Sequence, residues 1–305
     1  MGSYIVRRLG GAIVVLIGIA VITFLLSYAL PSDPARMILG MRASQAEVNQ
    51  LRIQMGLNLP LYEQFWRYFI NLLHGNLGQS YQLDMPVTEL IEQRLGLTAQ
   101  LALAAWLFEL IIGIPAGIIM ALKDRGFLDH TLNVITLIGV SLAPFFLGLE
   151  LLYWVAFKAN LFPAGGSGGI MYVILPGLTY GITGAAYYAR LLKTSMLDVL
   201  NSDYIRTARS KGAGMWRVVF GHALRNAMLP VMTYGATDIA ALFGGIVVIE
   251  DVFGYAGVGS LAVNAISQTD VPVIMGTVIF AAVFVVLFNV VVDLLYGLVD
   301  PRISY

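Results

Sequence analysis

The composition of this chain excludes an ordinary soluble protein. Of its 305 residues, 58% are hydrophobic and 12% are charged, whereas roughly a quarter of the residues in a soluble domain are charged. The formal net charge is zero, so no nucleic acid or other strongly charged partner is indicated. There is no cysteine, which excludes disulfides, thiolate metal sites and a cysteine nucleophile.

Six apolar segments are long enough to cross a bilayer, which takes about 20 helical residues. In chain order they cover residues 9–30, 97–122, 131–157, 171–188, 227–249 and 273–292. They predict an all-α integral membrane protein with six transmembrane helices, lying in the cell (inner or plasma) membrane. The first segment has an alternative interpretation as a cleaved signal peptide, since Ser27-Tyr28-Ala29 is a small-x-small site, although its apolar stretch is long for one.

The positions of lysine and arginine predict the orientation of these spans. With the N-terminus in the cytoplasm, most of the 18 basic residues fall in connectors on the cytoplasmic side, where such residues are enriched. Most of the others lie in one long outer loop, and loops of that length cross largely regardless of charge. Both termini are therefore expected in the cytoplasm.

The outer loop, residues 31–96, has the signals of a folded subdomain. Ser44 and Glu47 form a capping box ahead of one helix, which Gly56 ends, and a second helix is expected after Pro60. The loop is either a lid on its own spans or a docking surface for an external protein that delivers substrate. The predicted domains are an N-terminal transmembrane helix (1–30), this extracytoplasmic subdomain (31–96) and a five-helix core (97–305) with a cytoplasmic loop at 190–227.

Three carboxylates fall inside the predicted spans: Glu109, Glu150 and Asp238. An ionisable group at membrane depth costs about 2.5–3.5 kcal/mol on insertion scales, so each should face a bundle interior, a cavity or a partner. Two readings stay open. The carboxylates line a substrate pathway, or they are hydrogen-bonded packing residues between helices.

Glycines and prolines mark where the spans should pack closely or bend. Gly113 with Gly117, and Gly177 with Gly181, form small-residue faces that let helices approach. Prolines that should interrupt and kink spans two, three and four are Pro115, Pro144 and Pro176.

The cytoplasmic loop between spans four and five contains a short predicted helix. Helical spacing places Tyr204 and Ala208 on one face, and Gly212 is a natural stop. Such a helix could lie in a groove of a soluble partner. The alternative is a basic loop that only fixes topology.

A set of motifs along the whole chain resembles the permease subunits of bacterial peptide and nickel ABC importers, the dipeptide/oligopeptide permease B-like family. The motifs, in order, are Arg7-Arg8-Leu9, Pro31-Ser32-Asp33-Pro34, Gly75-Asn76-Leu77-Gly78-Gln79-Ser80, Tyr204-Ile205-Arg206-Thr207-Ala208-Arg209-Ser210-Lys211-Gly212, His222-Ala223-Leu224-Arg225-Asn226-Ala227-Met228-Leu229-Pro230, Val292-Asp293-Leu294-Leu295-Tyr296-Gly297 and Asp300-Pro301-Arg302.

The resemblance implies the type I ABC importer permease fold and a set of partners. These are a second homologous permease, two cytoplasmic ATP-binding subunits, an external substrate-binding protein and membrane lipid. It also implies that residues 204–212 are the coupling helix that enters an ATPase subunit. The coupling residues would be Tyr204, Ile205, Ala208, Arg209, Lys211 and Gly212.

The chain itself is not expected to be an enzyme. It has no Gly-Lys dipeptide and hence no phosphate-binding loop of the G-x-x-x-x-G-K-[ST] kind, so partner subunits would hydrolyse ATP. No cofactor is expected, and the scattered histidines, His74, His130 and His222, form no metal site. Nickel would therefore travel as a complex, and peptides and metal complexes both stay open as substrates. The competing functions are a membrane scaffold or signalling subunit and an intramembrane enzyme, and the enzyme lacks an H-E-x-x-H or G-x-S-x-G motif.

Overall fold

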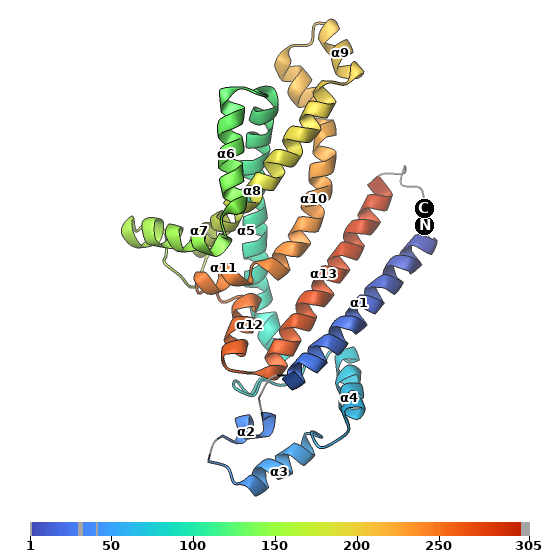
Figure 1. Ribbon diagram of the computed structural model, residues 1–305, viewed down its shortest axis with the longest axis vertical. Helices are drawn as coiled ribbons and strands as arrows, with labels where there is room; N and C mark the ends of the chain where they lie inside the picture. The colour runs from blue at the N-terminus through green and yellow to red at the C-terminus, as the bar shows by residue number, and fades with distance from the viewer. Residues whose placement is uncertain (1, 30–32, 41, 300–305) are drawn as a thin grey trace. The chain divides into compact units, whose positions relative to one another are not determined.

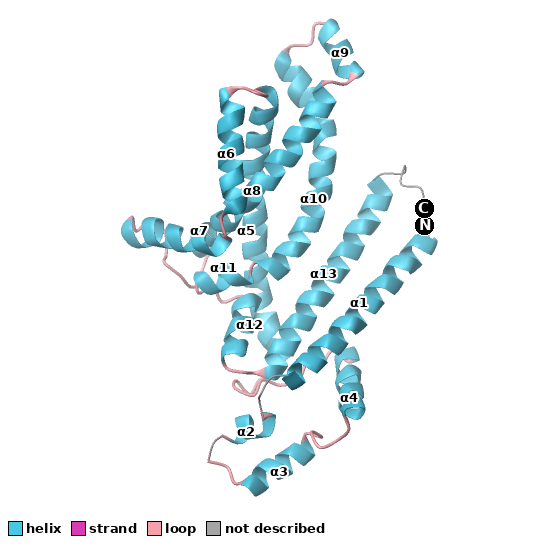
Figure 2. Ribbon diagram, viewed as in Figure 1, coloured by secondary structure: helices cyan, strands magenta, loops and turns pink. Residues whose placement is uncertain are grey.

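The chain is helical throughout the part that the structure describes. The computed structural model describes residues 2–29, 33–40 and 42–299. Within these ranges the only β pairing is an isolated bridge between Gln79 and Pro86, and Figure 2 shows helices joined by loops. This confirms the all-α fold class. Some motif residues lie outside the described ranges: Pro31, Ser32, Asp300, Pro301 and Arg302.

The helices are named as in Figure 1. In chain order they are α1 (Gly2–Ala29), α2 (Pro34–Leu39), α3 (Gln45–Gln54), α4 (Leu61–Leu73), α5 (Val87–Leu122), α6 (Phe127–Ser141), α7 (Pro144–Leu151), the π-helix η1 (Leu152–Lys158), α8 (Ile170–Leu200), α9 (Asp203–Ser210), the π-helix η2 (Arg217–Ala223), α10 (Leu224–Gly245), α11 (Val247–Val252), α12 (Val258–Ser267) and α13 (Val271–Val299).

Contacts divide the chain into two compact units: Met1–Thr98 with Ala256–Tyr305, and Ala99–Tyr255. In the first unit, α1 packs along α13, α12 packs on α13 and α4 lies against α1 (Figure 1). Its apolar core joins the start of α5 to α12 and α13, through residues such as Val87, Leu261 and Val273. The division into 1–30, 31–96 and 97–305 stays a prediction.

In the second unit, α6 and α10 both pack against α8, and α9 lies at one end of this bundle (Figure 1). Glycines allow α5 to approach α8 closely. A Cβ atom on Gly113 would lie 2.7 Å from the Ala185 carbonyl oxygen, and one on Gly181 would lie 2.3 Å from the Phe108 Cβ atom. The predicted small-residue faces are therefore confirmed as helix contacts.

The outer loop folds as its sequence predicts. The Ser44 hydroxyl accepts from the Glu47 N–H at 3.3 Å, and the Glu47 carboxylate accepts from the Ser44 N–H at 2.7 Å, which completes the capping box of α3. Gly56 follows α3 with a φ of +71°. α4 begins directly after Pro60 and packs on α1, where the Phe24 and Phe65 rings are 5.3 Å apart.

Four helices are long and apolar enough to cross a membrane: α1, α5, α8 and α13. The bent pair of α6 with α7–η1 raises the number to five if it is one span. The predicted span 227–249 falls on α10 and α11, and neither meets the same criterion of length and composition. The membrane character is thus clear, while the count of six spans stays a prediction.

The predicted span 131–157 is broken into two helices, and the predicted interruption at Pro144 is confirmed. α6 ends at Ser141, and α7 with η1 leaves it at an angle of 100°. Leu142 and Ala143 are extended, because the ring of Pro144 disfavours helical backbone in the residue before it, and Pro144 then begins α7. Pro115 and Pro176 lie inside continuous helices, α5 and α8, so they do not interrupt their spans.

Candidate functional site

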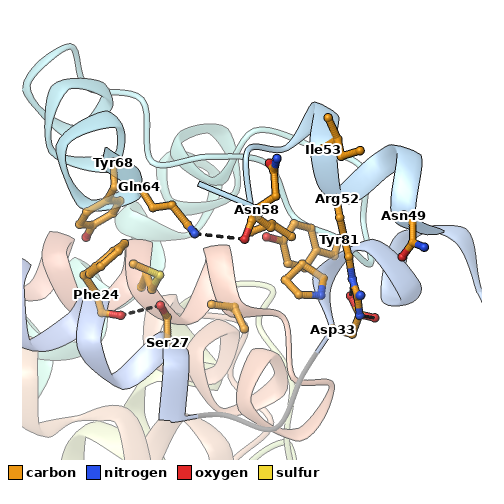
Figure 3. A pocket seen from close by; sticks show the side chains of 14 residues that line it. Phe24, Ser27, Asp33, Asn49, Arg52, Ile53, Asn58, Gln64, Tyr68 and Tyr81 are labelled. Atoms are coloured by element: carbon orange, nitrogen blue, oxygen red, sulfur yellow. Dashed lines mark hydrogen bonds and ion pairs between the residues drawn. The ribbon is translucent and has the colours of Figure 1, made fainter. Parts of the chain in front are cut away.

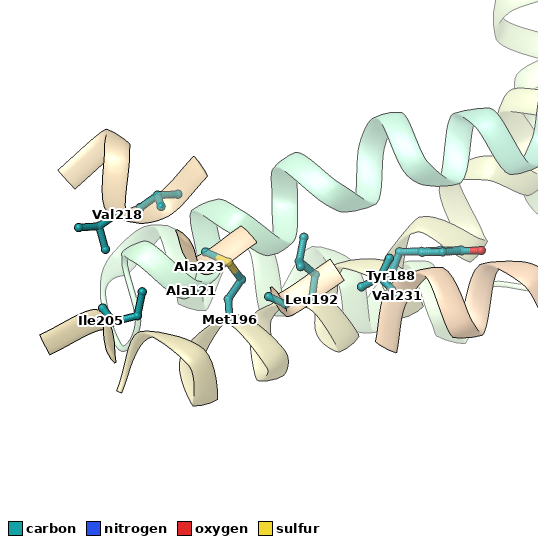
Figure 4. Packing of buried hydrophobic residues seen from close by; sticks show 10 residues of the cluster. Ala121, Tyr188, Leu192, Met196, Ile205, Val218, Ala223 and Val231 are labelled. Carbon is teal, nitrogen blue, oxygen red and sulfur yellow. The ribbon is translucent and has the colours of Figure 1, made fainter. Parts of the chain in front are cut away.

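The predicted coupling segment, residues 204–212, is attached to the second unit through one buried side chain. Ile205 is fully buried and belongs to a core with Met196 of α8, Val218 of η2 and Ala121 of α5 (Figure 4). A short helix of eight residues has little stability of its own, so this packing fixes the position of α9.

The other predicted coupling residues lie at the surface. Tyr204, Arg209, Lys211 and Gly212 are exposed, and Ala208 is half-buried. The Tyr204 hydroxyl accepts a hydrogen bond from the Asn226 side chain at 2.9 Å. Gly212 has a φ of +80°, so the chain reverses direction just after α9, as predicted. Of the six predicted coupling residues, Ile205 is thus the one that faces the core of the second unit.

An exposed apolar patch beside α9 is absent from the sequence prediction. Met215, Trp216 and Phe220 are all exposed, and the Trp216 and Phe220 rings stack 5.5 Å apart. The signal was present in the sequence, since these are large apolar residues in a polar, basic loop. Exposed apolar groups of this kind mark interaction surfaces.

Two of the three membrane carboxylates come together. Glu109 of α5 is 1% exposed, and Asp238 of α10 lines the same cavity. Asp238 accepts from the Tyr188 hydroxyl at 2.8 Å, and that hydroxyl accepts from Trp106 Nε1 at 3.1 Å. The Glu109 Oε2 atom is buried with no hydrogen-bond donor among the described residues.

Glu109 and Asp238 face a common cavity of about 230 Å³. Its walls include three tyrosines, Tyr180, Tyr187 and Tyr234. Gly184 leaves the room that the Glu109 carboxylate occupies, since a Cβ atom there would overlap the Oε1 atom. The sequence placed each carboxylate inside a span but could not show that they share a site.

The third candidate, Glu150, lies elsewhere. It is exposed on α7 and accepts a hydrogen bond from Trp154 Nε1 at 3.0 Å. It is not among the residues that line the cavity of Glu109 and Asp238. Among the residues that the structure describes, no group of three or more His, Asp or Glu side chains could hold a metal ion.

One apolar core connects the coupling segment to the carboxylate cavity. Tyr188, which donates to Asp238, belongs to the same cluster of buried residues as Ile205. Leu192 and Met196 continue the row along α8 between them (Figure 4). A displacement of α9 is therefore resisted by tightly packed side chains that reach the cavity.

The C-terminal half of α8 carries an ion-pair cluster that sequence reasoning missed. Lys193 Nζ lies 2.6 Å from the buried Asp129 carboxylate and 3.5 Å from that of Asp124. Asp129 also accepts from the Arg125 N–H at 3.0 Å and from the Asn133 side chain at 2.8 Å. These contacts fasten the turn between α5 and α6 to α8.

A larger cavity, of about 770 Å³, lies within the first unit, between the outer-loop helices and the ends of α1 and α13 (Figure 3). Arg52 and Asp33 form an ion pair at its wall, with Arg52 Nη2 2.6 Å from Asp33 Oδ2. The hydrogen bond from Arg52 holds the pKa of the Asp33 carboxyl below its usual range. The outer loop thus packs on its own spans and also encloses an open volume.

Asp270 anchors the loop that precedes α5. The buried Asp270 carboxylate accepts from the Ser80 hydroxyl, from the Tyr81 N–H at 3.2 Å and from the Gln82 N–H at 3.3 Å. Burial, and then the charge of Asp270, raise the pKa of Tyr81 to about 12. The outer-loop motif at 75–80 therefore ends on a structural contact with the segment before α13.

Comparisons with known proteins match this chain over its whole length. Residues 113–305 match the family "binding-protein-dependent transport system inner membrane component", and residues 1–102 match the N-terminal region of such membrane components. The chain is 37% identical to a probable peptide ABC transporter permease of Sinorhizobium fredii, and 38% identical to a glutathione transport system permease of Escherichia coli. Each alignment covers 100% of both chains.

A solved structure shares the fold. A chain of the MetNI methionine ABC transporter, in an inward-facing conformation, superposes with a TM-score of 0.59 at 16% identity, over 69% of this chain and 96% of that one. The helices, the family match and this likeness agree on one fold. The chain belongs to the family of inner-membrane components of binding-protein-dependent transport systems, as the permease subunit of an ABC importer.

Proposed function

We propose that this chain forms half of a translocation pathway for small peptides, and that residues 204–212 transmit the movement of an ATPase subunit to that pathway. The peptide substrate is supported by the printed functions of the relatives, one a probable peptide permease and another a glutathione permease. Neither name points to nickel or another metal complex.

The anchoring of Ile205 is the observation that carries the coupling role. α9 presents an exposed, basic surface while its one buried residue locks into a core shared by α5, α8 and η2. A partner that grips the exposed face would therefore move these elements together, because a packed core does not deform gradually. A loop that only fixes topology has no need of a fully buried anchor.

The exposed face of α9 suits a groove in a soluble protein. Ala208 and Gly212 are small enough for close approach, and the apolar patch of Met215, Trp216 and Phe220 adds area that a partner would remove from water. The proposed assembly has two ATP-binding subunits on this side, a second homologous permease and an external binding protein. Both termini then lie in the cytoplasm.

The outer loop is the proposed docking surface for the binding protein. α4 turns one side toward α1, and it leaves Tyr62, Trp66 and Leu73 exposed. The loop can therefore act both as a lid and as a docking surface, because one face packs on α1 and another is exposed.

The coupling role is tested by adding bulk to the exposed face. Ala208→Trp should prevent ATPase subunits from copurifying with the chain, or leave ATP hydrolysis unlinked to substrate. The matched control is Lys123→Trp, which adds the same side chain at an exposed position in the turn between α5 and α6, at the same end of the bundle (Figure 1). Normal assembly and normal substrate-stimulated hydrolysis in the Ala208→Trp complex would refute the coupling role.

A further inference from the structure

One carboxylate oxygen beside the cavity of Glu109 and Asp238 has no hydrogen-bond partner in the part of the chain that the structure describes. The buried Glu109 Oε2 atom has no donor among the residues described, and the neighbouring Asp238 carboxyl receives one hydrogen bond, from Tyr188. A buried carboxylate without a donor is costly, and two carboxylates in contact repel each other when both are ionised. The site therefore has two carboxyl groups and, among the described residues that line it, no positively charged side chain.

The walls of the cavity favour an organic cation over a metal ion. Tyr180, Tyr187 and Tyr234 line it, and the faces of aromatic rings attract cations. Two carboxylates with no histidine fall short of a metal ligand set in the described part of the chain. An ammonium group has three donors and no acceptor, which matches Glu109, Asp238 and a tyrosine hydroxyl oxygen.

We infer that this cavity binds the free amino group of the transported peptide. The inference rests on the proposed peptide substrate and deepens it, since it assigns one chemical group of the substrate to two residues. A volume of about 230 Å³ accommodates the terminal residue of a peptide but not a whole longer peptide. The remainder of the substrate would therefore extend outside the cavity.

The position of the site gives the binding a consequence for transport. Tyr188 connects Asp238 to the core that holds Ile205 of α9. An amino group bound between α5 and α10 therefore touches the same packed elements that the ATPase would move through α9. Occupancy of the cavity and the position of α9 would then influence each other, because coupling between two sites is reciprocal.

Direct binding tests the inference without relying on uptake. The full chain is placed in lipid nanodiscs with the subunits that copurify with it, and binding of each radiolabelled probe is measured by equilibrium dialysis. The probes are L-alanyl-L-alanine and its N-acetyl derivative, which differ in the charge of the amino group.

The expected result is saturable binding of the free peptide and no binding of the acetylated one. Glu109→Gln, which keeps size and removes the charge, should weaken binding of the free peptide at least tenfold, the loss of a charge-assisted hydrogen bond. Glu92→Gln is the matched control, because Glu92 is an exposed carboxylate on the same helix. Its binding should equal that of the parent protein.

Three results would overturn the inference: equal binding of the two probes, no saturable binding of either probe, or unchanged binding in Glu109→Gln. The carboxyl pair would then be a packing contact between helices. The comparison of probes on the unsubstituted cavity holds even if Glu109→Gln fails to fold. Absence of binding with intact ATP-driven peptide uptake refutes this site alone. Selective binding without such uptake by the complete transporter refutes the proposed function instead.

Discussion

Gly113→Ala should separate α5 from α8 and lower the stability of the second unit. A methyl group at this position would lie 2.7 Å from both the Ala185 carbonyl oxygen and the Tyr188 Cβ atom, closer than such contacts allow, and both belong to the helix itself rather than to a flexible side-chain end. Overpacking of this kind costs about 1–3 kcal/mol. Tyr188 also holds Asp238, so the same shift would disturb the carboxylate cavity.

Gly96→Ala on the same helix isolates the steric effect. No atom lies within 4 Å of the position that a Cβ atom would take at Gly96. Both variants gain the helix propensity of alanine over glycine, about 1 kcal/mol, so the difference between them is the overpacking cost alone. The free energy of unfolding of each is measured by SDS titration in mixed micelles, followed by circular dichroism. Equal stability of the two variants would refute the close packing of α5 on α8.

Two further predictions concern the outer loop. Asp270→Ala removes the acceptor of the Ser80 hydroxyl and of two backbone N–H groups, which costs about 1–3 kcal/mol for each buried donor left unpaired. Hydrogen exchange of residues 78–86 should therefore accelerate. Unchanged exchange would contradict the anchoring role. The Asp33 carboxyl has a lowered pKa, so its pair with Arg52 stabilises the fold above the unfolded pKa near 4 and loses this effect as the pH falls through the lower folded value. Arg52→Gln should accordingly lower the thermal midpoint only slightly at pH 7, because the pair is partly exposed, and should match the parent protein near pH 2; a difference that persists at pH 2 would contradict the assignment.

The local structure of the chain was largely readable from its sequence. Helix ends follow from side chains near in sequence, which is why the capping box of Ser44 and Glu47 and the stops at Gly56 and Gly212 were predicted correctly. The glycine face of α5 was readable for a related reason. A row of small residues at helical spacing has few uses in a membrane other than close packing.

All three span prolines were predicted to interrupt their helices, but only Pro144 does so. A proline inside an apolar stretch can be accommodated within a helix, as Pro115 and Pro176 are, or can begin a new helix, as Pro144 does. The composition of the three segments is similar, so the outcome depends on tertiary packing that the sequence does not state.

The candidate site was only half predictable. The depth of Glu109 and Asp238 in the membrane followed from hydropathy, whereas their meeting follows from how α5 and α10 pack with α8. Glu150, which also falls inside a predicted span, is exposed on α7 because the chain turns at Pro144. Asp270 was missed because its partner Ser80 lies 190 residues away in the sequence.

ATP-driven uptake by the reconstituted transporter tests the central claim most directly. The chain and its copurifying subunits are placed in proteoliposomes with the external binding protein, and accumulation of a radiolabelled dipeptide is followed. We predict accumulation above the equilibrium level that requires ATP, and that is abolished by Ala208→Trp but retained by Lys123→Trp. Accumulation that persists in the Ala208→Trp transporter, or the absence of any ATP-dependent accumulation with the unsubstituted chain, would contradict the account.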